Sequence, residues 1–223
     1  MLPVARLRSY LALASSLAPI PCRDDFAAAA EAHFHKLGTA AEVGVFQGQF
    51  AGKNLKKWTG RYWAIDAWRH RPGDPWDKNF KDPAKNDANY EAARQATAHA
   101  GERVALVRNT SLEAAGFFPD GHFDWLYIDA LHTYSALRDD LRAWWPKLRP
   151  GGLCTGDDYG DENATDFVSE ERYAKMYTNV PKKYHWGVMR ATQGFARKVG
   201  VPLQITWMRD CYHWPAWYMI KPP

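Results

Sequence analysis

The stretch from Phe123 to Tyr159 constrains the fold most, because it is typical of a strand, a helix and a second strand. Residues 123–128 form a short apolar run, as expected of a strand that is buried on both faces of a parallel sheet. From Thr133, an expected N-cap, apolar residues recur at helical spacing, and Pro-Gly-Gly at 150–152 is expected to end that helix. A second strand is expected over residues 153–156.

An acid follows each of these two strands: Asp129 after the first, and Asp157 and Asp158 after the second. A parallel crossover returns the chain in the same direction, so both acidic ends emerge at one edge of the sheet, on strands about 4.8 Å apart. We therefore expect the three carboxylates to converge. In open α/β sheets, this edge is where ligands bind.

The rest of the chain continues the alternation of helices and strands. We expect helices over 25–37, 49–58, 90–99, 112–115 and 184–199, and strands over 40–46, 61–65, 104–108, 203–208 and 217–220. The last two strands suit an antiparallel hairpin on an otherwise parallel sheet. The order predicts an α/β fold with a doubly wound, mostly parallel Rossmann-like sheet.

Residues 68–89 contain three prolines and no periodicity, so we expect a long loop there. Its aromatic residues Trp68, Trp76 and Phe80 predict an ordered lid near the substrate, or a cover over the edge of the core.

Residues 42–48 have the form E-x-G-x-x-x-G, with Glu42, Gly44 and Gly48 at the fixed positions. These glycines allow a tight strand-to-helix turn and a close approach to a ligand, although G-x-G-x-x-G itself is absent and a purely packed turn stays open. Asp66 lies 22 residues after Gly44, and an acid at about that distance binds a ribose diol in doubly wound folds. Ser111, after the strand at 104–108, is expected either to contact an adenine edge or to cap a helix.

Composition narrows the class of protein. The 223 residues, 46% of them hydrophobic, suffice for one globular unit. The net charge of +4 is scattered along the chain, so we expect no nucleic-acid partner. Three cysteines without a CxxC pair favour reduced thiols in an intracellular protein.

The start of the chain has Arg6, Arg8 and Arg23 before its first acid, Asp24, which fits either a transit peptide or an amphipathic helix packed on the core. We favour the helix, and its apolar part is too short to span a membrane. We expect residues 1–37 to form an N-terminal helical segment and residues 38–223 the cofactor-binding domain. A cytoplasmic location is expected, with organellar targeting as the alternative, and a homo-oligomer is possible.

Three strings, AEVGVFQGQFA at 41–51, YWAIDAW at 62–68 and the run at 124–159, resemble one enzyme family. The chain resembles the class I S-adenosylmethionine-dependent methyltransferases, and specifically the small-molecule group related to macrocin-type sugar O-methyltransferases. The resemblance covers residues 38–220. It implies a seven-stranded sheet with a reversed final strand, and methyl transfer to a hydroxyl of a small molecule.

The resemblance also implies site residues. It places the cofactor at Glu42, Gly44, Val45, Phe46, Gly48, Asp66, Ala67, Trp68, Ser111, Asp129, Ala130 and His132. It implies Mg²⁺ at Asp129, Asp157 and Asp158, and catalysis by His132, Asp129 and Asp158. The chain departs from its relatives at His132, where some have an aspartate base, and at Gly156–Tyr159, where many have G-H-D-Y.

Methyl transfer from a sulfonium is an in-line displacement, so the enzyme must position the acceptor and deprotonate its hydroxyl. Bound Mg²⁺ would lower the pKa of that hydroxyl, and His132 could then accept the proton. Structural roles stay open for His132 and for the pair Asp157 and Asp158.

Three other functions stay open. They are an N-methyltransferase without metal, an NAD(P)-dependent oxidoreductase on a similar sheet, and a binding protein that has lost catalysis. The tryptophans expected near the pocket could stack on a sugar or an aromatic ring, or surround an amine: Trp68, Trp76, Trp207, Trp214 and Trp217.

Overall fold

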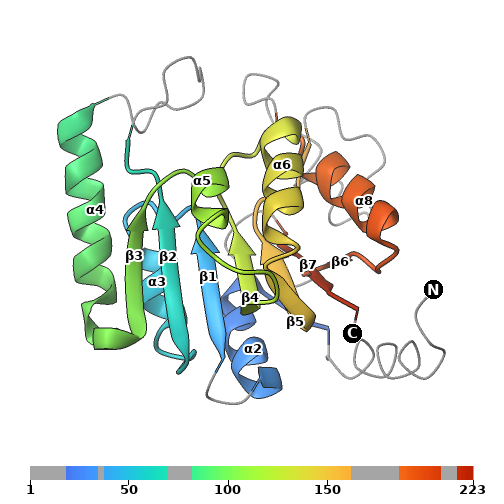
Figure 1. Cartoon of the computed structure of the whole chain (residues 1–223), viewed down its shortest axis with the longest axis horizontal. Helices are drawn as coiled ribbons and strands as arrows, with labels where there is room; N and C mark the ends of the chain where they lie inside the picture. Colours follow the sequence, from blue (N-terminus) through green and yellow to red (C-terminus); the bar gives the residue numbers. More distant parts are fainter. Residues whose placement is uncertain (1–18, 35–37, 70–81, 162–185, 207–214, 223) are drawn as a thin grey trace.

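The structure, a computed structural model, describes residues 19–34, 38–69, 82–161, 186–206 and 215–222. Its centre is a seven-stranded sheet in the order β3-β2-β1-β4-β5-β7-β6 (Figure 1). The strands are β1 (Thr39–Val43), β2 (Arg61–Asp66), β3 (Val104–Arg108), β4 (Phe123–Ile128), β5 (Leu148–Gly156), β6 (Gln204–Ile205) and β7 (Trp217–Ile220). The first five are parallel, and β7 runs antiparallel to both β5 and β6. The predicted fold class, including the reversed terminal strand, is confirmed.

Helices cover both faces of this sheet, with α5 and α6 on one face and α2 and α3 on the other (Figure 1). The helical elements are η1 (Arg23–Asp25), α2 (Phe26–Phe34), α3 (Gln49–Asn54), α4 (Pro83–Thr97), η3 (Ala98–Arg103), α5 (Ser111–Ala115), α6 (Tyr134–Trp144) and α8 (Val188–Val199). The side chains of Asp82, Thr110 and Thr133 cap α4, α5 and α6, because each accepts a backbone N–H of the first turn.

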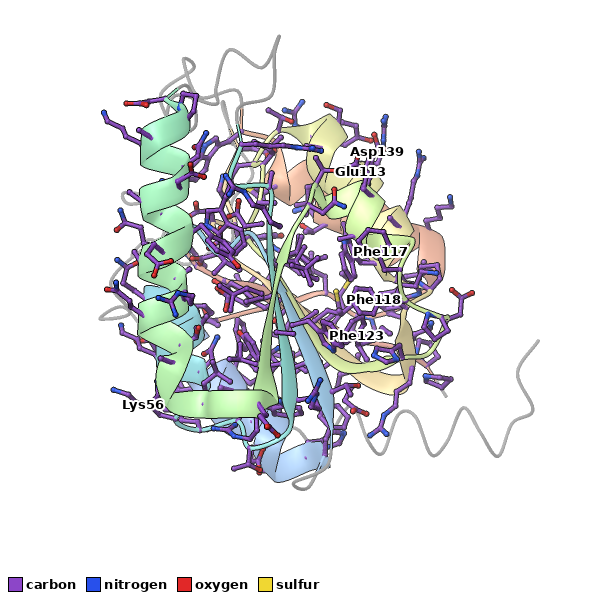
Figure 2. The ribbon with its side chains drawn as sticks, turned by 60° about the vertical axis from the view of Figure 1, so that its left-hand side comes forward. Lys56, Glu113, Phe117, Phe118, Phe123 and Asp139 are labelled. Atoms are coloured by element: carbon purple, nitrogen blue, oxygen red, sulfur yellow. The ribbon has the colours of Figure 1, made fainter. Side chains whose placement is uncertain are left out.

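The core lies along β4, all six residues of which are buried. Phe118 and Phe123 pack edge to face with ring centroids 4.8 Å apart, whereas Lys56, Glu113 and Phe117 lie at the surface (Figure 2). Burial on both faces explains why β4 is apolar except for Asp124, whose buried carboxylate forms an ion pair with Arg149. This central strand carries Asp129 at its carboxyl end.

Several expected boundaries are wrong: the strand expected over 40–46 ends at Val43, the helix expected over 49–58 ends at Asn54, and two larger differences follow. The helix α6 ends at Trp144, and Pro150, Gly151 and Gly152 lie within β5 instead of ending a helix. Backbone hydrogen bonds between Lys221 and the two glycines hold this part of β5 in the sheet. The expected loop at 68–89 is also too long, because Asp82 caps α4 at Pro83, a position where proline is favoured.

Several expectations fall outside the described residues: the helix before Pro19 is not described, nor are Trp76, Phe80, Trp207 and Trp214. None of the helices in the described part of the chain combines the length and the apolar character that a membrane span requires. The thiol of Cys154 is free, but Cys22 is disulfide-bonded, which corrects the expectation that all cysteines are reduced.

Candidate active site

The parallel pairing of β4 and β5 brings their acidic ends together. Ile128 pairs with Gly156, so the residues that follow, Asp129 and Asp158, emerge at the same edge of the sheet. The backbone N–H of Asp129 donates to the carbonyl of Val43 at 2.7 Å, which fixes the start of the loop after β4. Asp158 has a left-handed backbone, with φ of 51°, which is uncommon for a residue with a side chain.

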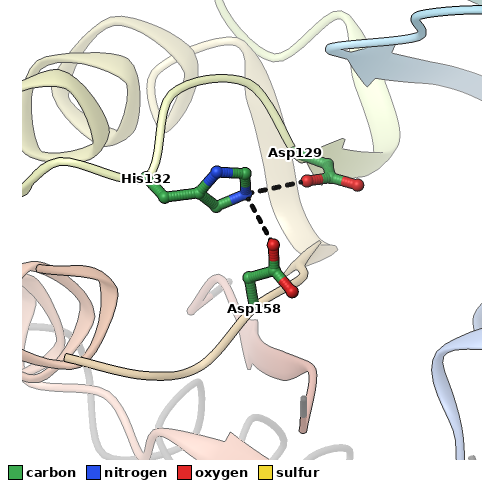
Figure 3. A group of neighbouring side chains, drawn as sticks. All are labelled: Asp129, His132 and Asp158. Atoms are coloured by element: carbon green, nitrogen blue, oxygen red, sulfur yellow. Dashed lines mark hydrogen bonds and ion pairs between the residues drawn. The ribbon is translucent and has the colours of Figure 1, made fainter. Parts of the chain in front are cut away.

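His132 lies between these two carboxylates (Figure 3). Its Nε2 lies 3.0 Å from Oδ1 of Asp129 and 3.1 Å from Oδ2 of Asp158. The three side chains can each offer one ligand atom, and these atoms lie within 4.8 Å of one another. Among the residues that the structure describes, this is the one such group of metal-ligating side chains. We call it the edge cluster.

Two contacts fix the position of His132. Its ring lies against Trp186 with centroids 5.1 Å apart, and its carbonyl accepts the N–H of Gly187 at 2.8 Å. Thr133 then caps α6, so His132 stands just before a fixed helix start. Its side chain is 25% exposed, which leaves it open to a ligand.

The pKa values of two members of the edge cluster, His132 and Asp158, are raised by their surroundings. Burial opposes the charge on His132, but the hydrogen bond with Asp129 and the negative charges of Asp158 and Asp129 outweigh burial and raise its pKa to about 9. Burial raises the pKa of Asp158 to about 6, although the charges of His132 and Arg23 oppose this rise. At neutral pH, His132 is therefore a cation held between two carboxylates.

Asp157, the third predicted ligand, does not join this cluster. Its side chain is only 2% exposed and forms a close ion pair with Arg23 of η1. Among the described residues, Oδ1 of Asp157 has no hydrogen-bond partner. Consecutive side chains therefore point to different places: Asp157 into the protein, and Asp158 to His132.

The glycine turn lies beside the edge cluster. Gly44 has φ of 92°, and a Cβ there would lie 1.9 Å from the carbonyl oxygen of Asp129 and 2.8 Å from Cα of Ala130. Gly48 has φ of 77°, and a Cβ there would lie 2.7 Å from Cα of Ala93 in α4. Both glycines are needed for close packing between backbones, so the packed-turn interpretation accounts for them without a ligand.

The carboxylate of Asp66, at the end of β2, binds the backbone of the glycine turn. Its Oδ2 accepts the backbone N–H groups of Val45 at 2.9 Å and Phe46 at 2.8 Å, and its Oδ1 accepts that of Trp68 at 2.9 Å. Burial raises the pKa of Asp66, and these hydrogen bonds, together with one from Ala67, oppose the rise. The carboxylate that we expected at the ribose thus already binds the turn that would face the cofactor.

The other predicted cofactor residues differ in their exposure. Phe46 has φ of 53° and is 40% exposed. Trp68 is fully buried, and its ring N–H donates to the carbonyl of Phe46, so it supports the turn from inside. The hydroxyl of Ser111 donates to Asp140 and accepts from Trp144, while Thr110 caps the helix that we expected Ser111 to cap.

Glu42 points away from the surface of the site. It is 1% exposed and accepts hydrogen bonds from the hydroxyl of Tyr62 and the amide of Asn54. Burial raises the pKa of Glu42 to about 8, against the hydrogen bond from Tyr62. Glu42 is therefore largely protonated at neutral pH.

Sequence reasoning missed Arg23 and Trp186. Both reach the site from elements distant in the sequence, and Arg23 is separated from Asp157 by 134 positions. No local pattern marks such contacts. The sequence offered one indication for Arg23: it precedes the acids Asp24 and Asp25, whereas Arg6 and Arg8 lie in a stretch without acids.

Comparison with known proteins places this geometry in context. A family model described as a methyltransferase domain matches residues 41–159, which include the glycine turn and the edge cluster. No curated protein sequence matches the chain significantly.

Solved structures share the fold over nearly the whole chain. A Staphylococcus aureus protein assigned as a caffeoyl-CoA O-methyltransferase has a TM-score of 0.58 at 17% identity, covering 99% of this chain and 93% of that one. The Burkholderia thailandensis 1,6-didemethyltoxoflavin-N1-methyltransferase, with S-adenosylhomocysteine bound, has a TM-score of 0.54 at 16% identity, covering 99% and 89%. A Bacillus cereus O-methyltransferase in complex with S-adenosylhomocysteine has a TM-score of 0.52 at 15% identity, covering 99% and 93%.

Proposed function

The chain belongs to the methyltransferase-domain family, and from this premise we propose that it moves a methyl group from S-adenosylmethionine to a hydroxyl of a small molecule, assisted by a divalent cation. The observation that carries the proposal is the edge cluster of Asp129, His132 and Asp158 beside the Gly44 turn. Two of the similar structures are named O-methyltransferases, and two contain S-adenosylhomocysteine, which supports this choice of reaction and cofactor.

The cofactor would lie over the glycine turn. The exposed ring of Phe46 and the loop at Asp129 and Ala130 border this position, since Gly44 packs against both loop residues. Asp66 would contribute by holding the N–H groups of Val45 and Phe46 in place, in addition to any contact with the ribose. The methyl group would then face the edge cluster.

The acceptor would lie at His132, which is partly exposed and rests on Trp186. An imidazole must be neutral to accept a proton, and the two carboxylates instead keep His132 protonated up to a pH of about 9. His132 becomes a base at neutral pH only when Asp129 and Asp158 are engaged by another cation. This requirement links the proton acceptor to the metal.

The donor atoms fit a divalent cation of the Mg²⁺ or Mn²⁺ type. Mg²⁺ is commonly held by one or two carboxylates and keeps several waters, and Asp129 and Asp158 supply two. Such an ion would lower the pKa of the acceptor hydroxyl and orient its oxygen. Trp186 and Gly187 would meanwhile keep His132 near that oxygen.

One observation favours a second candidate, an N-methyltransferase without metal. Protonated His132 already neutralises part of the charge of Asp129 and Asp158, so the edge cluster is stable without an ion. A neutral amine is a stronger nucleophile than a neutral hydroxyl and can attack without first becoming an anion, so an amine acceptor would not need the cation. The Burkholderia thailandensis enzyme is named for methylation at nitrogen.

Calorimetric titration with S-adenosylhomocysteine tests the cofactor, with NAD⁺ as the control ligand. We expect micromolar binding of S-adenosylhomocysteine and no binding of NAD⁺, and the reverse preference would move an oxidoreductase to first place. The titration is repeated with EDTA and with Mg²⁺. Methyl transfer to hydroxyl and amine acceptors, each with and without Mg²⁺, then separates the two candidates: turnover of an amine in EDTA would refute the metal-assisted O-methyltransferase.

A further inference from the structure

Arg23 reaches the active-site edge from outside the sheet. It belongs to the short helix η1, which contacts α3 and the turn after it through Asp24. The ammonium of Lys53 in α3 lies 3.6 Å from the carboxylate of Asp24, and that of Lys57 in the turn donates to its carbonyl at 2.7 Å. Cys22, which precedes Arg23, is disulfide-bonded. The backbone that carries Arg23 is thus held on both sides.

The guanidinium of Arg23 is held as well. It lies over the ring of Phe50, 5.1 Å from the centroid, and Phe50 in turn packs on Tyr127 of β4 with centroids 4.5 Å apart. From this position Arg23 binds Asp157, whose carboxylate is almost fully buried. A buried carboxylate needs a partner, and its other oxygen has no hydrogen bond among the described residues.

Asp157 and Asp158 are consecutive residues, so fixing one constrains the other. Asp158 has φ of 51°, a conformation that costs about 1–3 kcal/mol and persists only when its surroundings impose it. On one side, the N–H of Tyr159 donates to the carbonyl of Pro215 at 2.7 Å. On the other side, the anchor is the ion pair between Asp157 and Arg23.

We propose that Arg23 is a positioning residue, which holds Asp157 inside the protein and thereby turns Asp158 toward His132. The inference rests on the proposed function only in using a divalent cation as its probe. It assigns the N-terminal element η1 a role in arranging the catalytic edge, and it predicts that Asp157 is not itself a metal ligand.

The chain provides a matched control at the opposite end of the same two strands. Arg149 forms a close ion pair with Asp124, which is also buried, and its guanidinium lies 5.1 Å from the ring centroid of Phe34. The two pairs share the same stacking distance and a buried aspartate, although the side chain of Arg149 is 45% exposed and that of Arg23 is 23% exposed. It differs in lying at the amino end of β4, away from the edge cluster.

The experiment measures the affinity of the metal-free protein for Mn²⁺ by electron paramagnetic resonance, and stability by urea unfolding, for Arg23→Met and Arg149→Met. We expect Arg23→Met to bind Mn²⁺ at least tenfold more weakly, and Arg149→Met to bind within twofold of the wild type even where it loses stability. Electrostatics alone predict the opposite change in affinity for Arg23→Met, because removing a cation near Asp158 should strengthen the binding of Mn²⁺. Unchanged or tighter binding by Arg23→Met would overturn the proposal.

Two further variants separate positioning from a general loss of structure. Asp157→Asn can still accept from Arg23 and should keep Mn²⁺ affinity within threefold; a large loss would make Asp157 a ligand and overturn the proposal. The double variant Arg23→Met/Asp157→Asn leaves no buried charge, so it should regain stability yet still bind Mn²⁺ at least fivefold more weakly. If its affinity recovers together with its stability, Arg23 has only a structural role.

A crystallographic measurement decides the inference independently of metal. If the wild type binds no Mn²⁺, metal assistance fails as part of the proposed function, but the distance between Oδ2 of Asp158 and Nε2 of His132 still tests Arg23. We expect the 3.1 Å contact to be lost in the double variant and kept in Arg149→Met. A preserved contact in the double variant would refute the positioning role.

Discussion

Replacement of Glu42 by glutamine should reduce the loss of stability that this protein undergoes at alkaline pH. The pKa of Glu42 is about 8 in the folded protein, because burial disfavours its charged form, against 4.5 for an exposed glutamate. Between these two pH values, the folded state holds a proton that the unfolded state has released. The contribution of protonated Glu42 is therefore fully present below pH 4.5 and is lost as the pH rises through 8.

The magnitude follows from the difference of the two pKa values. At about 1.4 kcal/mol for each pKa unit, a rise from 4.5 to about 8 corresponds to roughly 5 kcal/mol, of which relaxation of the site would remove a part. Glutamine cannot ionise, and its carbonyl can still accept from Tyr62 and Asn54. The variant should lose about 1 kcal/mol at pH 5, where an amide replaces a neutral carboxyl, and gain about 2–4 kcal/mol over the wild type at pH 9.

Urea unfolding at pH 5, 7 and 9 measures this difference between variant and wild type. Glu91→Gln serves as the control, since Glu91 is on the surface of α4 and pairs with Arg94. The control should show a difference that hardly changes across the range, because solvent screens the charge of an exposed side chain. If the Glu42→Gln difference is equally constant, Glu42 is ionised in the folded protein, and our account of its burial is wrong.

Three further predictions concern the turn, the edge cluster and the core. Gly44→Ala should lower the free energy of unfolding by at least about 3 kcal/mol in urea titrations, because its Cβ would collide with the carbonyl of Asp129 at a positive φ. The control is Gly194→Ala in α8, where a Cβ would meet no other atom within 4 Å. This control should be neutral or stabilising by up to about 1 kcal/mol. Asp158→Ala should abolish metal-dependent methyl transfer while leaving the affinity for S-adenosylhomocysteine within about threefold; full turnover would disprove its metal role. Burial raises the pKa of Cys154 to about 12, so iodoacetamide at pH 8 should leave this residue unlabelled in the native protein and label it in urea, as peptide mass spectrometry would show.

Local sequence patterns were enough for the elements that build the site. The apolar run of β4, the Thr133 cap of α6 and the acids at the strand ends follow from composition and spacing over short stretches, and the structure agrees with them. Since parallel strands align their carboxyl ends, the meeting of Asp129 and Asp158 could also be predicted.

Contacts between distant segments were not predictable in this way. Two adjacent aspartates gave no indication that Asp157 would pair with Arg23, because that choice depends on where η1 lies. Likewise, the pairing of Lys221 with Gly151 and Gly152 extends β5 through residues that would end a helix in isolation. In both cases tertiary contacts override the local preference of the chain.

The charge of the edge cluster leads to one more test. At pH 7, two carboxylates and protonated His132 leave one net negative charge, which would be balanced by the positive sulfonium of the cofactor. A divalent cation bound by Asp129 and Asp158 weakens the interactions that raise the pKa of His132, so the imidazole should release its proton. The site would then be neutral with metal alone, and again with a sulfonium and an alkoxide present together.

We therefore expect uptake of Mn²⁺ at pH 7.5 to release about one proton per ion, measured by calorimetry in buffers of different ionisation enthalpy. His132→Gln should bind the ion with much less proton release, since this variant lacks the imidazolium proton that the ion would displace. Equal heats in all buffers for the wild type would show that His132 stays protonated beside the metal and cannot be the base.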